Sequence, residues 1–541
     1  MGKEKQGEIR MNLPIEIPYL AAAALPVVFL LTMVMKFGWG VAKAAPYGML
    51  IAFVISVIIF KADIPAMGLE AGKGAWNAAT ILLVIWPAVF SYELLCETNG
   101  FQAIRRGVYS ITKHELLQIL ILGWIFPSFL QGITGFGVAV AVGAPLLLSI
   151  GVTPLYSIVI VLLCHCWGAT FGTLALSWNA LIAQAGMTDE QNIQAAFFAA
   201  LMIWIFNLVC VLLSCFMYGR MKAIREAAPV VLLFSLIMGG GELLLAPINP
   251  TVACFLPSSI ALAAAMFIGR TKHYQSKWEI KDSPIMVKTA PKQSAENNMT
   301  FHQAFLPYYL LTFITVVCLL IPPITQILDK LQFGFSFPET STGYGFVTKA
   351  ERLFSPLKPL TYAGTFLTVT SVVSFFYYKS KRFIKTEDLK SVWSRTFKKC
   401  ISPTRAILCL IIMSKFMSGS GMIYVLSQGI VHIAGSYYVI ISPFLGMLGS
   451  FITSSNMSSN ILLGNFQSTA ASLLNINPAI TCALQTMGGI LGDAFAPGCV
   501  IMGISTTGYT GKESNILKKI VPVSISFAAL YGIISFFILS C

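Results

Sequence analysis

Two short clusters of small and polar residues interrupt apolar stretches that are otherwise long enough to cross a membrane. The first cluster runs from Phe129 to Gly137 and reads FLQGITGFG, and the second runs from Ile452 to Asn460 and reads ITSSNMSSN. A helix in lipid finds no water for unpaired backbone groups, so an interrupted helix persists only where it lines a cavity within the protein. Two such interruptions, one in each half of the chain, therefore indicate a transport site near the middle of the membrane.

The composition indicates a protein that crosses the membrane many times. Of the residues, 56% are hydrophobic and 11% are charged, and many apolar runs reach about 20 residues, the length that crosses roughly 30 Å of hydrocarbon. The first run, near 18–35, lacks a small-residue cleavage site, so we expect a retained helix. The 12 cysteines lie mostly inside apolar runs without a spaced framework, which indicates reduced packing residues.

The distribution of charge predicts which connectors face the cytoplasm. The formal net charge is +14, and segment 270–302 holds six Lys and Arg against three acids, whereas segment 379–399 holds eight against two. Segment 325–358 is nearly balanced, with four against three. The positive-inside rule places the first two segments in the cytoplasm and the third outside. Because the basic residues lie in these connectors, we do not expect a nucleic-acid partner.

The predicted fold class is an all-α polytopic membrane protein with about 12 transmembrane helices and two re-entrant hairpins. Both termini then lie outside. The hairpins are expected over 115–150 and 436–475, each entering the membrane and returning to the same side. The predicted crossings are 18–36, 44–60, 75–97, 154–185, 193–219, 229–246, 250–269, 304–324, 359–378, 405–432, 478–508 and 519–540.

The two hairpins approach from opposite faces in this topology, which is the arrangement of an inverted repeat. A weak sequence echo agrees with it. The echo consists of three pairs displaced by 324 residues: Pro154 and Pro478, Gly168 and Gly492, and Phe171 and Phe495. The predicted units are a first repeat over 1–228, connecting helices and a basic cytoplasmic linker over 229–303, and a second repeat over 304–541. We expect the polar linker 270–302 to be flexible.

Motifs along most of the chain resemble the L-lactate permease family, which comprises bacterial carriers of lactate and related 2-hydroxy monocarboxylates. The resemblance implies a multi-pass protein of the bacterial inner (plasma) membrane that transports a small carboxylate together with a proton. The motifs are Trp86-Pro87, Thr98, Gly100-Phe101, Ile104-Arg105, Phe129-Leu130, Gly135-Phe136-Gly137, Pro154-Leu155-Tyr156, Ser442 to Gly446, Thr453, Ser455, Ser458-Ser459-Asn460, Gly488-Gly489, Pro497 and Gly511 to Ser514.

Three positions depart from the family pattern. The family usually has glutamate where Gln131 stands, aspartate where Asn456 stands and lysine where Asp493 stands. Proton coupling needs a group that gains and loses a proton, which an amide cannot do. Sodium, which suits hard oxygen ligands near the hairpin tips, therefore stays open as the alternative coupling ion.

The candidate substrate-binding residues are those able to replace the hydration shell of a carboxylate and a hydroxyl. Half-helix N-termini supply backbone N–H groups and a favourable dipole, and glycines let backbone approach the ligand closely. The alternative is that these small residues only let helices pack closely. The candidates are Gln131, Gly132, Thr134, Gly135, Thr453, Ser454, Ser455, Asn456, Ser458, Ser459, Asn460 and Lys415.

Charged residues within apolar spans are the candidates for ion coupling, because each costs free energy in the membrane. Asp493 is the first candidate for a proton or cation site. Lys415 would bind the anion or neutralise Asp493, or else extend toward an interface. We expect Glu93, Glu97 and Glu242 to lie at membrane interfaces.

His165 lies between Cys164 and Cys166, which raises the question of a metal site. Adjacent residues of a helix point in different directions, so this triplet cannot readily close on one ion, and we predict no metal. A neutral core histidine is the simpler interpretation. A proton relay, which would make His165 an ion-coupling residue, is the alternative.

The predicted function is a secondary carrier that works by alternating access and takes lactate or glycolate. An anion channel would need a continuous polar path, and an enzyme would need a nucleophile-base or metal constellation that the sequence lacks. The segment Gly508 to Ser514 lacks the spacing of a phosphate loop, so we expect no nucleotide, cofactor or primary pump. Another small organic anion remains the alternative substrate, and a homo-oligomer remains open.

Overall fold

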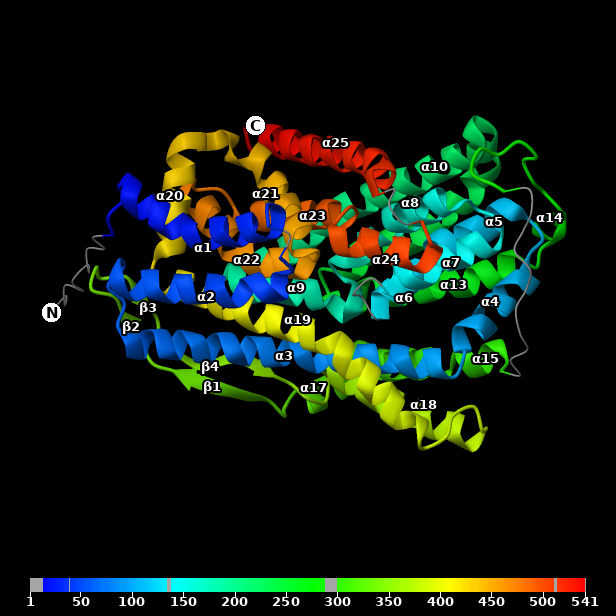
Figure 1. Cartoon of the computed structure of the whole chain (residues 1–541), viewed down its shortest axis with the longest axis horizontal. Coiled ribbons are helices and arrows are strands. Elements are labelled where there is room, and N and C mark those ends of the chain that lie inside the picture. The colour runs from blue at the N-terminus through cyan, green and yellow to red at the C-terminus, as the bar shows by residue number, and fades with distance from the viewer. Residues whose placement is uncertain (1–12, 38, 134–137, 288–298, 510–512, 541) are drawn as a thin grey trace.

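This computed structural model describes residues 13–37, 39–133, 138–287, 299–509 and 513–540, and there the chain is almost entirely helical (Figure 1). Within these residues eight helices are long and apolar enough to cross a membrane, or up to ten if each of two bent helix pairs counts as one span. Three further apolar helices are shorter. The chain is therefore an all-α polytopic membrane protein, whereas the number of twelve crossings stays a prediction.

The first half contains a helix hairpin followed by a broken helix. A Cβ atom on Gly143 would lie 2.9 Å from Pro127. Helices α6 and α7 therefore pack against each other as a hairpin within the predicted range 115–150. Helices α8 and α9 are bent by 54° at their junction. The elements are α1 (Ile17–Met35), α2 (Val41–Ile58), α3 (Ile64–Glu97), α4 (Gly100–Ile111), α5 (Glu115–Leu120), the π-helical turn η1 (Ile121–Ile125), α6 (Phe126–Ile133), α7 (Val138–Ser149), α8 (Pro154–His165), the 3-10 turn η2 (Cys166–Ala169) and α9 (Gly172–Ala185).

A long kinked helix and a shorter apolar helix connect the two halves. Non-helical backbone at Gly219 and Arg220 divides α10 at the end of the predicted crossing 193–219. The elements are α10 (Asp189–Ser235), the π-helical turn η3 (Leu236–Gly240), α11 (Gly241–Leu245), α12 (Pro250–Ala253), α13 (Phe255–Ile268) and α14 (Lys272–Gln275).

The segment after α13 is docked on the first half. The backbone N–H of Thr153 donates to Ile285 O at 2.7 Å, and that of Glu115 donates to Trp278 O at 3.0 Å. The prediction of a flexible linker is therefore wrong for residues 270–287. The polar composition of this segment does not reveal that its backbone carbonyls accept hydrogen bonds from the first residues of membrane helices.

The second half repeats the order of hairpin and broken helix. Ser459 Oγ donates to Gly446 O at 2.8 Å, so α21 and α22 form a hairpin within the predicted range 436–475. Residues 494–496 then separate α23 from α24. The elements are α15 (Phe301–Ala304), α16 (Leu306–Leu320), α17 (Pro322–Leu328), β1 (Phe333–Phe337), β2 (Thr340–Ser341), β3 (Val347–Thr348), β4 (Glu351–Leu357), α18 (Ala363–Ser380), α19 (Asp388–Gly419), α20 (Met422–Ala434), the 3-10 turn η4 (Gly435–Tyr437), α21 (Tyr438–Thr453), α22 (Asn456–Leu473), α23 (Pro478–Asp493), α24 (Pro497–Thr507) and α25 (Glu513–Ser540).

The strands form two small antiparallel pairs, β1 with β4 and β2 with β3, in the connector that was predicted to lie outside. Phe335 lies opposite Phe354 in the larger pair. This local structure was not predicted from the sequence, although its signal is the alternation of phenylalanine with small residues in β1.

Two helices extend beyond their predicted bounds. Helix α3 begins at Ile64 rather than near 75, because Glu70 and Lys73 pair at 3.0 Å and so keep two charges inside the fold. Helix α19 begins at Asp388 and ends at Gly419. Gly421, with φ of 86°, caps the start of the next helix, α20, so the predicted single crossing over 405–432 is wrong. The long helices α3 and α19 pack along each other (Figure 1).

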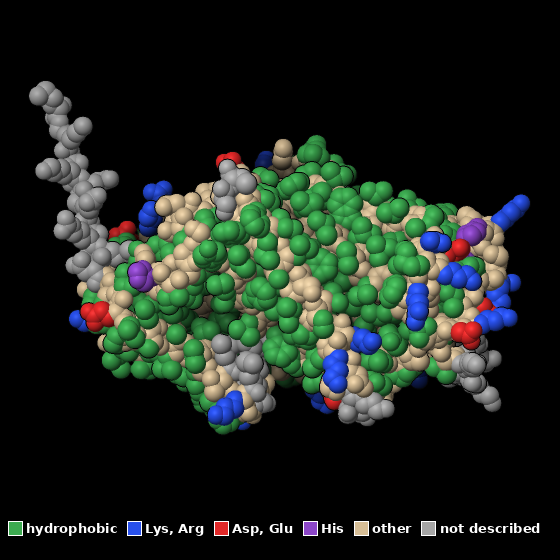
Figure 2. All heavy atoms as spheres, turned by 90° about the horizontal axis from the view of Figure 1, so that it is seen from above, with side chains coloured by type: hydrophobic (Ala, Val, Ile, Leu, Met, Phe, Trp, Pro, Cys, Tyr) green, Lys and Arg blue, Asp and Glu red, His purple; other side chains and the backbone are tan. Residues whose placement is uncertain are grey.

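Small residues let α21 and α23 approach closely. A Cβ atom on Gly488 would lie 2.0 Å from Pro443 O, and one on Gly492 would lie 2.2 Å from Met447 O. Membrane helices commonly pack through such residues. Hydrophobic side chains cover the middle of the face in Figure 2, and most charged side chains lie toward its rim, as a lipid-facing belt requires.

Candidate functional site

A cavity of about 380 Å³ lies where the two hairpins meet the two broken helices. Residues from both halves of the chain line it. From the first half these are Ile85, Val89, Tyr92, Gln131, Val138, Ala141, His165, Ala169, Gly172, Thr173, Leu176 and Ser177; from the second half they are Lys399, Pro403, Ser454, Ser455, Asn456, Met457, Asp493, Gly498, Cys499 and Met502.

Six of the predicted site residues line this cavity, and the others that the structure describes do not. The six are Gln131, His165, Ser454, Ser455, Asn456 and Asp493. The described residues outside the lining are Gly132, Thr453, Ser458, Ser459, Asn460 and Lys415. Thr134 and Gly135 lie outside the described residues.

The residues outside the lining mostly support it. Gly132 lies against the backbone of Phe255, because a Cβ atom on Gly132 would lie 3.0 Å from the Cα atom of Phe255. Thr453 Oγ1 donates to Gly449 O, and Ser459 Oγ donates to Gly446 O, each at 2.8 Å. Ser455 Oγ accepts from Ser458 N at 3.3 Å, which caps α22. These bonds hold the second hairpin together rather than pointing into the cavity.

Each hairpin tip rests on a glycine of the broken helix in the same half. A Cβ atom on Gly172 would lie 2.6 Å from the backbone oxygen of Gln131, and one on Gly489 would lie 1.9 Å from Asn456 Oδ1. Real Cβ atoms do not approach other atoms so closely, so only glycine permits these contacts. Gln131 is held through its backbone and Asn456 through its side chain.

Asn456 and Asn460 tie the second hairpin to the broken helix of the first half. Asn456 Nδ2 donates to Ala169 O at 3.2 Å and to Thr170 Oγ1 at 3.1 Å. Asn460 Nδ2 donates to Ser177 O at 3.1 Å and to Thr486 Oγ1 at 3.0 Å. Thr170, Ser177 and Thr486 were not predicted from the sequence, although Thr170 adjoins the Gly168 and Phe171 echo.

Backbone strain marks the start of α9. Thr173, Leu174 and Ala175 have φ values of 50°, 55° and 61°, in the left-handed region. That conformation costs a non-glycine residue roughly 1–2 kcal/mol. Consecutive strained residues beside a cavity are typical of functional sites, where the surrounding structure holds them in place.

Two helices begin at the cavity. Lining residues occupy the first turns of α22 and α24, represented by Asn456 and Gly498, whereas Val138 and Gly172 line it from α7 and α9. The N-terminal turn of a helix presents unpaired N–H groups and the positive end of its dipole. The cavity is therefore suited to an anion, and one of these donors, Gly498 N–H, is already bound by Ser454 Oγ at 3.1 Å.

His165 presents a hydrogen-bond acceptor to the cavity. Its Nδ1 lies 2.7 Å from Val161 O, and a carbonyl can only accept, so Nδ1 carries the proton. In the neutral ring Nε2 then keeps its lone pair. This atom can accept the hydroxyl proton of a ligand.

Asp493 supplies a carboxyl group at the end of α23. The residue is 8% exposed. Its Oδ1 accepts a hydrogen bond from the Cys499 thiol, with Sγ at 3.9 Å. Among the described residues it forms no ion pair, and in particular none with Lys415. A carboxyl can take up and release a proton, which neither Gln131 nor Asn456 can do.

A charged cluster lies where the cavity reaches the exposed side chain of Lys399. Lys399 Nζ lies 2.5 Å from Glu93 Oε1 and 4.7 Å from the ring centroid of Tyr92. Arg395 Nε lies 2.7 Å from Glu93 Oε2, and Arg395 also pairs with Glu97. Lys399 was not among the predicted site residues because it belongs to a basic connector.

Lys415 lies in a different buried cluster. Its Nζ is 5.4 Å from the ring centroid of Phe354, and Lys73 Nζ is 5.8 Å from the same centroid. Lys73 pairs with Glu70 at 3.0 Å. Because this cluster lies against Phe354 of strand β4 and outside the cavity lining, the expectation that Lys415 binds the substrate or neutralises Asp493 does not match its position.

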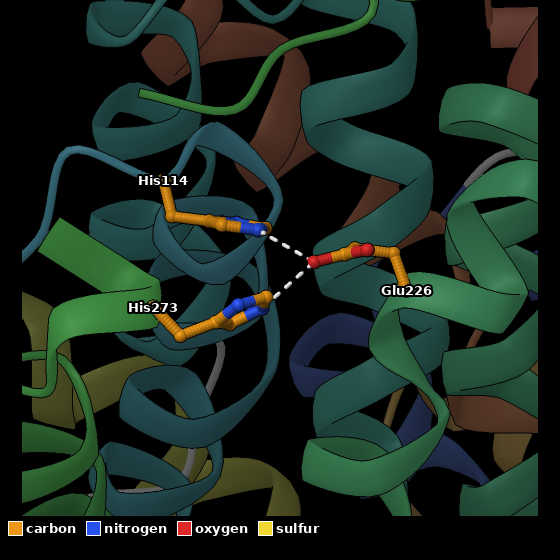
Figure 3. Close-up of side chains that lie close together, drawn as sticks. All are labelled: His114, Glu226 and His273. Atoms are coloured by element: carbon orange, nitrogen blue, oxygen red, sulfur yellow. Dashed lines mark hydrogen bonds and ion pairs between the residues drawn. The ribbon is translucent and has the colours of Figure 1, made fainter. Parts of the chain in front are cut away.

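A second group of possible ligands lies away from the cavity and was not predicted. His114, Glu226 and His273 converge in Figure 3, with both Nε2 atoms on Glu226 Oε1 at 3.2 and 2.9 Å. His114 Nδ1 accepts from Leu117 N at 3.3 Å and caps α5. The proton of neutral His114 is therefore on Nε2, which leaves no lone pair there for a metal ion.

Comparisons with known proteins point to one family. The family model described as L-lactate permease matches residues 20–541. The L-lactate permease of Bacillus subtilis (strain 168) is 27% identical and 90% of each chain is covered. The L-lactate permease of Escherichia coli (strain K12) is 25% identical, with 95% of this chain and 94% of the relative covered.

A glycolate permease and a solved transporter structure are also similar to this chain. The glycolate permease GlcA of Escherichia coli (strain K12) is 24% identical, with 90% of each chain covered. Among solved structures, the YdaH transporter of Alcanivorax borkumensis is similar with a TM-score of 0.47 and 11% identity, covering 88% of this chain and 87% of that chain. Because the family model spans nearly the whole sequence, the chain belongs to the L-lactate permease family.

Proposed function

We propose that this protein is a secondary carrier that moves a small 2-hydroxy monocarboxylate, lactate or glycolate, together with a proton by alternating access. The supporting observation is the cavity of about 380 Å³ on which Gln131, Asn456 and the N-termini of α22 and α24 converge. Relatives named for lactate and glycolate support this substrate class.

The cavity offers partners for each part of such a substrate. Helix N-termini and the hydroxyls of Ser454 and Ser455 would receive the carboxylate. His165 Nε2 would accept the 2-hydroxyl proton. Apolar Val138 and Met457 would contact the small remainder of the molecule.

Asp493 is the proposed proton site, with His165 as a relay partner. Both side chains line the cavity, so a proton and a carboxylate would reach the same space. Carrying both together neutralises the substrate charge during its passage through the membrane. Sodium is the second candidate ion, because the oxygens of Ser454, Ser455 and Asn456 would suit a hard cation.

The cavity reaches Lys399, in the basic segment that the positive-inside rule places in the cytoplasm. We propose that this arrangement is the inward-facing state, in the inner membrane and with both termini outside. The pair of hairpins would form an inverted repeat around the central site.

Uptake of radiolabelled lactate and glycolate into proteoliposomes, under separate proton and sodium gradients, tests the proposal. We expect saturable uptake that a proton gradient drives and a sodium gradient does not. Asp493→Asn should abolish proton-driven accumulation, whereas Asp63→Asn, at an exposed helix start, should leave it unchanged. Proton-driven uptake that survives Asp493→Asn would refute the coupling role, and non-saturating flux would indicate a channel.

A further inference from the structure

Glu242 is a carboxyl group that the sequence analysis placed at an interface and that the structure buries completely. The residue is 0% exposed, so the interface expectation is wrong. Among the described residues, neither of its carboxyl oxygens has a hydrogen-bond partner. An ionised carboxylate without partners is not held in an apolar interior, so Glu242 holds a proton in this structure.

The backbone around Glu242 is irregular. It lies in α11, directly after the π-helical turn η3. A Cβ atom on Gly239 in that turn would lie 2.0 Å from the ring of Trp204, so glycine lets the turn pack there. Such π-helical turns within α-helices occur frequently at functional sites.

Glu242 faces few other titratable groups. Turn η3 and helices α12 and α13 contain no Asp, Glu, Lys, Arg or His, and Cys254, between α12 and α13, interacts electrostatically with Glu242. In the described part of the chain no residue of α10 forms an ion pair with Glu242. The titratable residues of α10 are Asp189, Glu190, Cys210, Cys215, Tyr218, Arg220, Lys222, Arg225 and Glu226.

A short chain of contacts leads from Glu242 to the cavity. A Cβ atom on Gly168 would lie 3.0 Å from Cys254 Sγ and 3.1 Å from Gln131 Cγ. The Cys254 and Gln131 side chains therefore both pack against this glycine. Gln131 lines the cavity. Cys254 is thus a neighbour both of Glu242 and of Gln131, which lines the cavity.

A further buried polar atom on this path lacks a partner. Gln131 Oε1 has no hydrogen-bond partner among the described residues, whereas Ser258 lies within hydrogen-bonding reach of the Cys254 thiol. Buried polar atoms are usually paired with protein or ordered water. Unpaired oxygens on Glu242 and Gln131, both neighbours of Cys254, are the arrangement that water molecules would join into a path for protons.

We propose that Glu242 is a second proton-binding group of the transport cycle, which exchanges its proton with the cavity past Cys254 and Gln131. The proposal rests on the carrier function proposed above. The carboxyl O–H bond breaks when the proton passes to water in the path, and it forms again when a proton returns. Two carboxyls, Asp493 and Glu242, would then flank the cavity from the second half and from the connecting helices.

Glu242→Gln separates this role from a structural one, because glutamine keeps the shape of the neutral acid but cannot release a proton. In proteoliposomes we expect lactate exchange without gradients within about twofold of the wild type, and proton-driven accumulation lowered by about tenfold or more. Glu242→Asp should restore part of the accumulation. An internal pH dye should report the matching loss of proton uptake.

Two results would overturn the proposal while leaving the carrier function intact. One is unchanged accumulation and proton uptake in Glu242→Gln. The other is equal loss of exchange and accumulation in a variant of unchanged thermal stability, which would show a role in binding or movement. If the wild type itself accumulates no lactate under a proton gradient, the proposed function fails instead.

A measurement on the wild type removes the dependence on folding of the variant. Dicyclohexylcarbodiimide reacts with protonated carboxyls in apolar surroundings, and mass spectrometry locates the adduct. We expect label on Glu242 that decreases as pH rises and changes with saturating lactate. An unlabelled Glu242, or label that responds to neither, contradicts the proposal.

Discussion

The contacts beneath Gln131 and Asn456 show how single atoms determine the cavity. Gly172 and Gly489 each accept a tip residue at a distance that no other residue type permits. The two tips come from opposite halves of the chain. Their positions therefore depend on the absence of one methyl group in each broken helix.

Gly172→Ala and Gly489→Ala should both lower lactate uptake, because the added methyl group displaces Gln131 or Asn456 from the cavity wall. Overpacking of this kind costs about 1–3 kcal/mol, so the thermal midpoint in detergent should fall as well. Gly68→Ala is the control, since a Cβ atom there meets nothing within 4 Å. Normal uptake in both variants would mean that the tips do not bind substrate.

Arg395→Gln should destabilise the protein at the mouth of the cavity. Glu93, whose side chain is 2% exposed, would keep Lys399 but lose its hydrogen bond from Arg395. A hydrogen bond to a charged group contributes about 1.5–3 kcal/mol, and partial exposure of Arg395 places the loss toward the lower value. Lys398→Gln removes the same charge from an exposed position on α19 and should leave the thermal midpoint unchanged. Equal midpoints for both variants would refute this role.

Among the elements, α5 depends on a titratable cap. Burial lowers the pKa of His114 below its usual value of 6.5, and the hydrogen bond that His114 donates to Glu226 opposes this. Because the folded pKa is the lower one, the unfolded state binds more protons below about pH 6.5, and stability falls as pH drops through that value. A protonated Nδ1 also cannot accept the Leu117 N–H.

His114→Asn keeps an N-cap acceptor but does not titrate. We expect the amides of α5 to lose protection from hydrogen exchange in the wild type between pH 7.5 and pH 5.5, relative to the variant at each pH. The same pH dependence in both proteins would show that His114 is not the responsible group.

The elements that the sequence predicted well are those whose signal is local. The hairpins over 115–150 and 436–475 follow from small and polar residues inside apolar runs, whereas the breaks within 154–185 and 478–508 were not predicted. Helix α3 was predicted too short because Glu70 and Lys73 pair with each other one turn apart, which a hydropathy pattern does not register. Glu242 and Lys415 were misplaced because their burial comes from tertiary packing around them.

In the molecule as a whole, two hairpins from separate halves of the chain build one cavity. Gln131 and Asn456 were predicted to meet from their polar surroundings, and both line the cavity. Thr170, Ser177 and Thr486 could not be predicted, since they act only through partners far apart in the sequence. Lys399 approaches the cavity because α19 folds along α3.

Equilibrium binding of L-lactate to the purified protein is the most direct test that this cavity holds the substrate between the two halves. Gln131→Ala and Asn456→Ala should each weaken binding about tenfold or more, which corresponds to about 1.4 kcal/mol. Gln428→Ala, on α20 away from the cavity, should bind as the wild type does. Unchanged binding in both cavity variants, at unchanged thermal stability, would contradict the account.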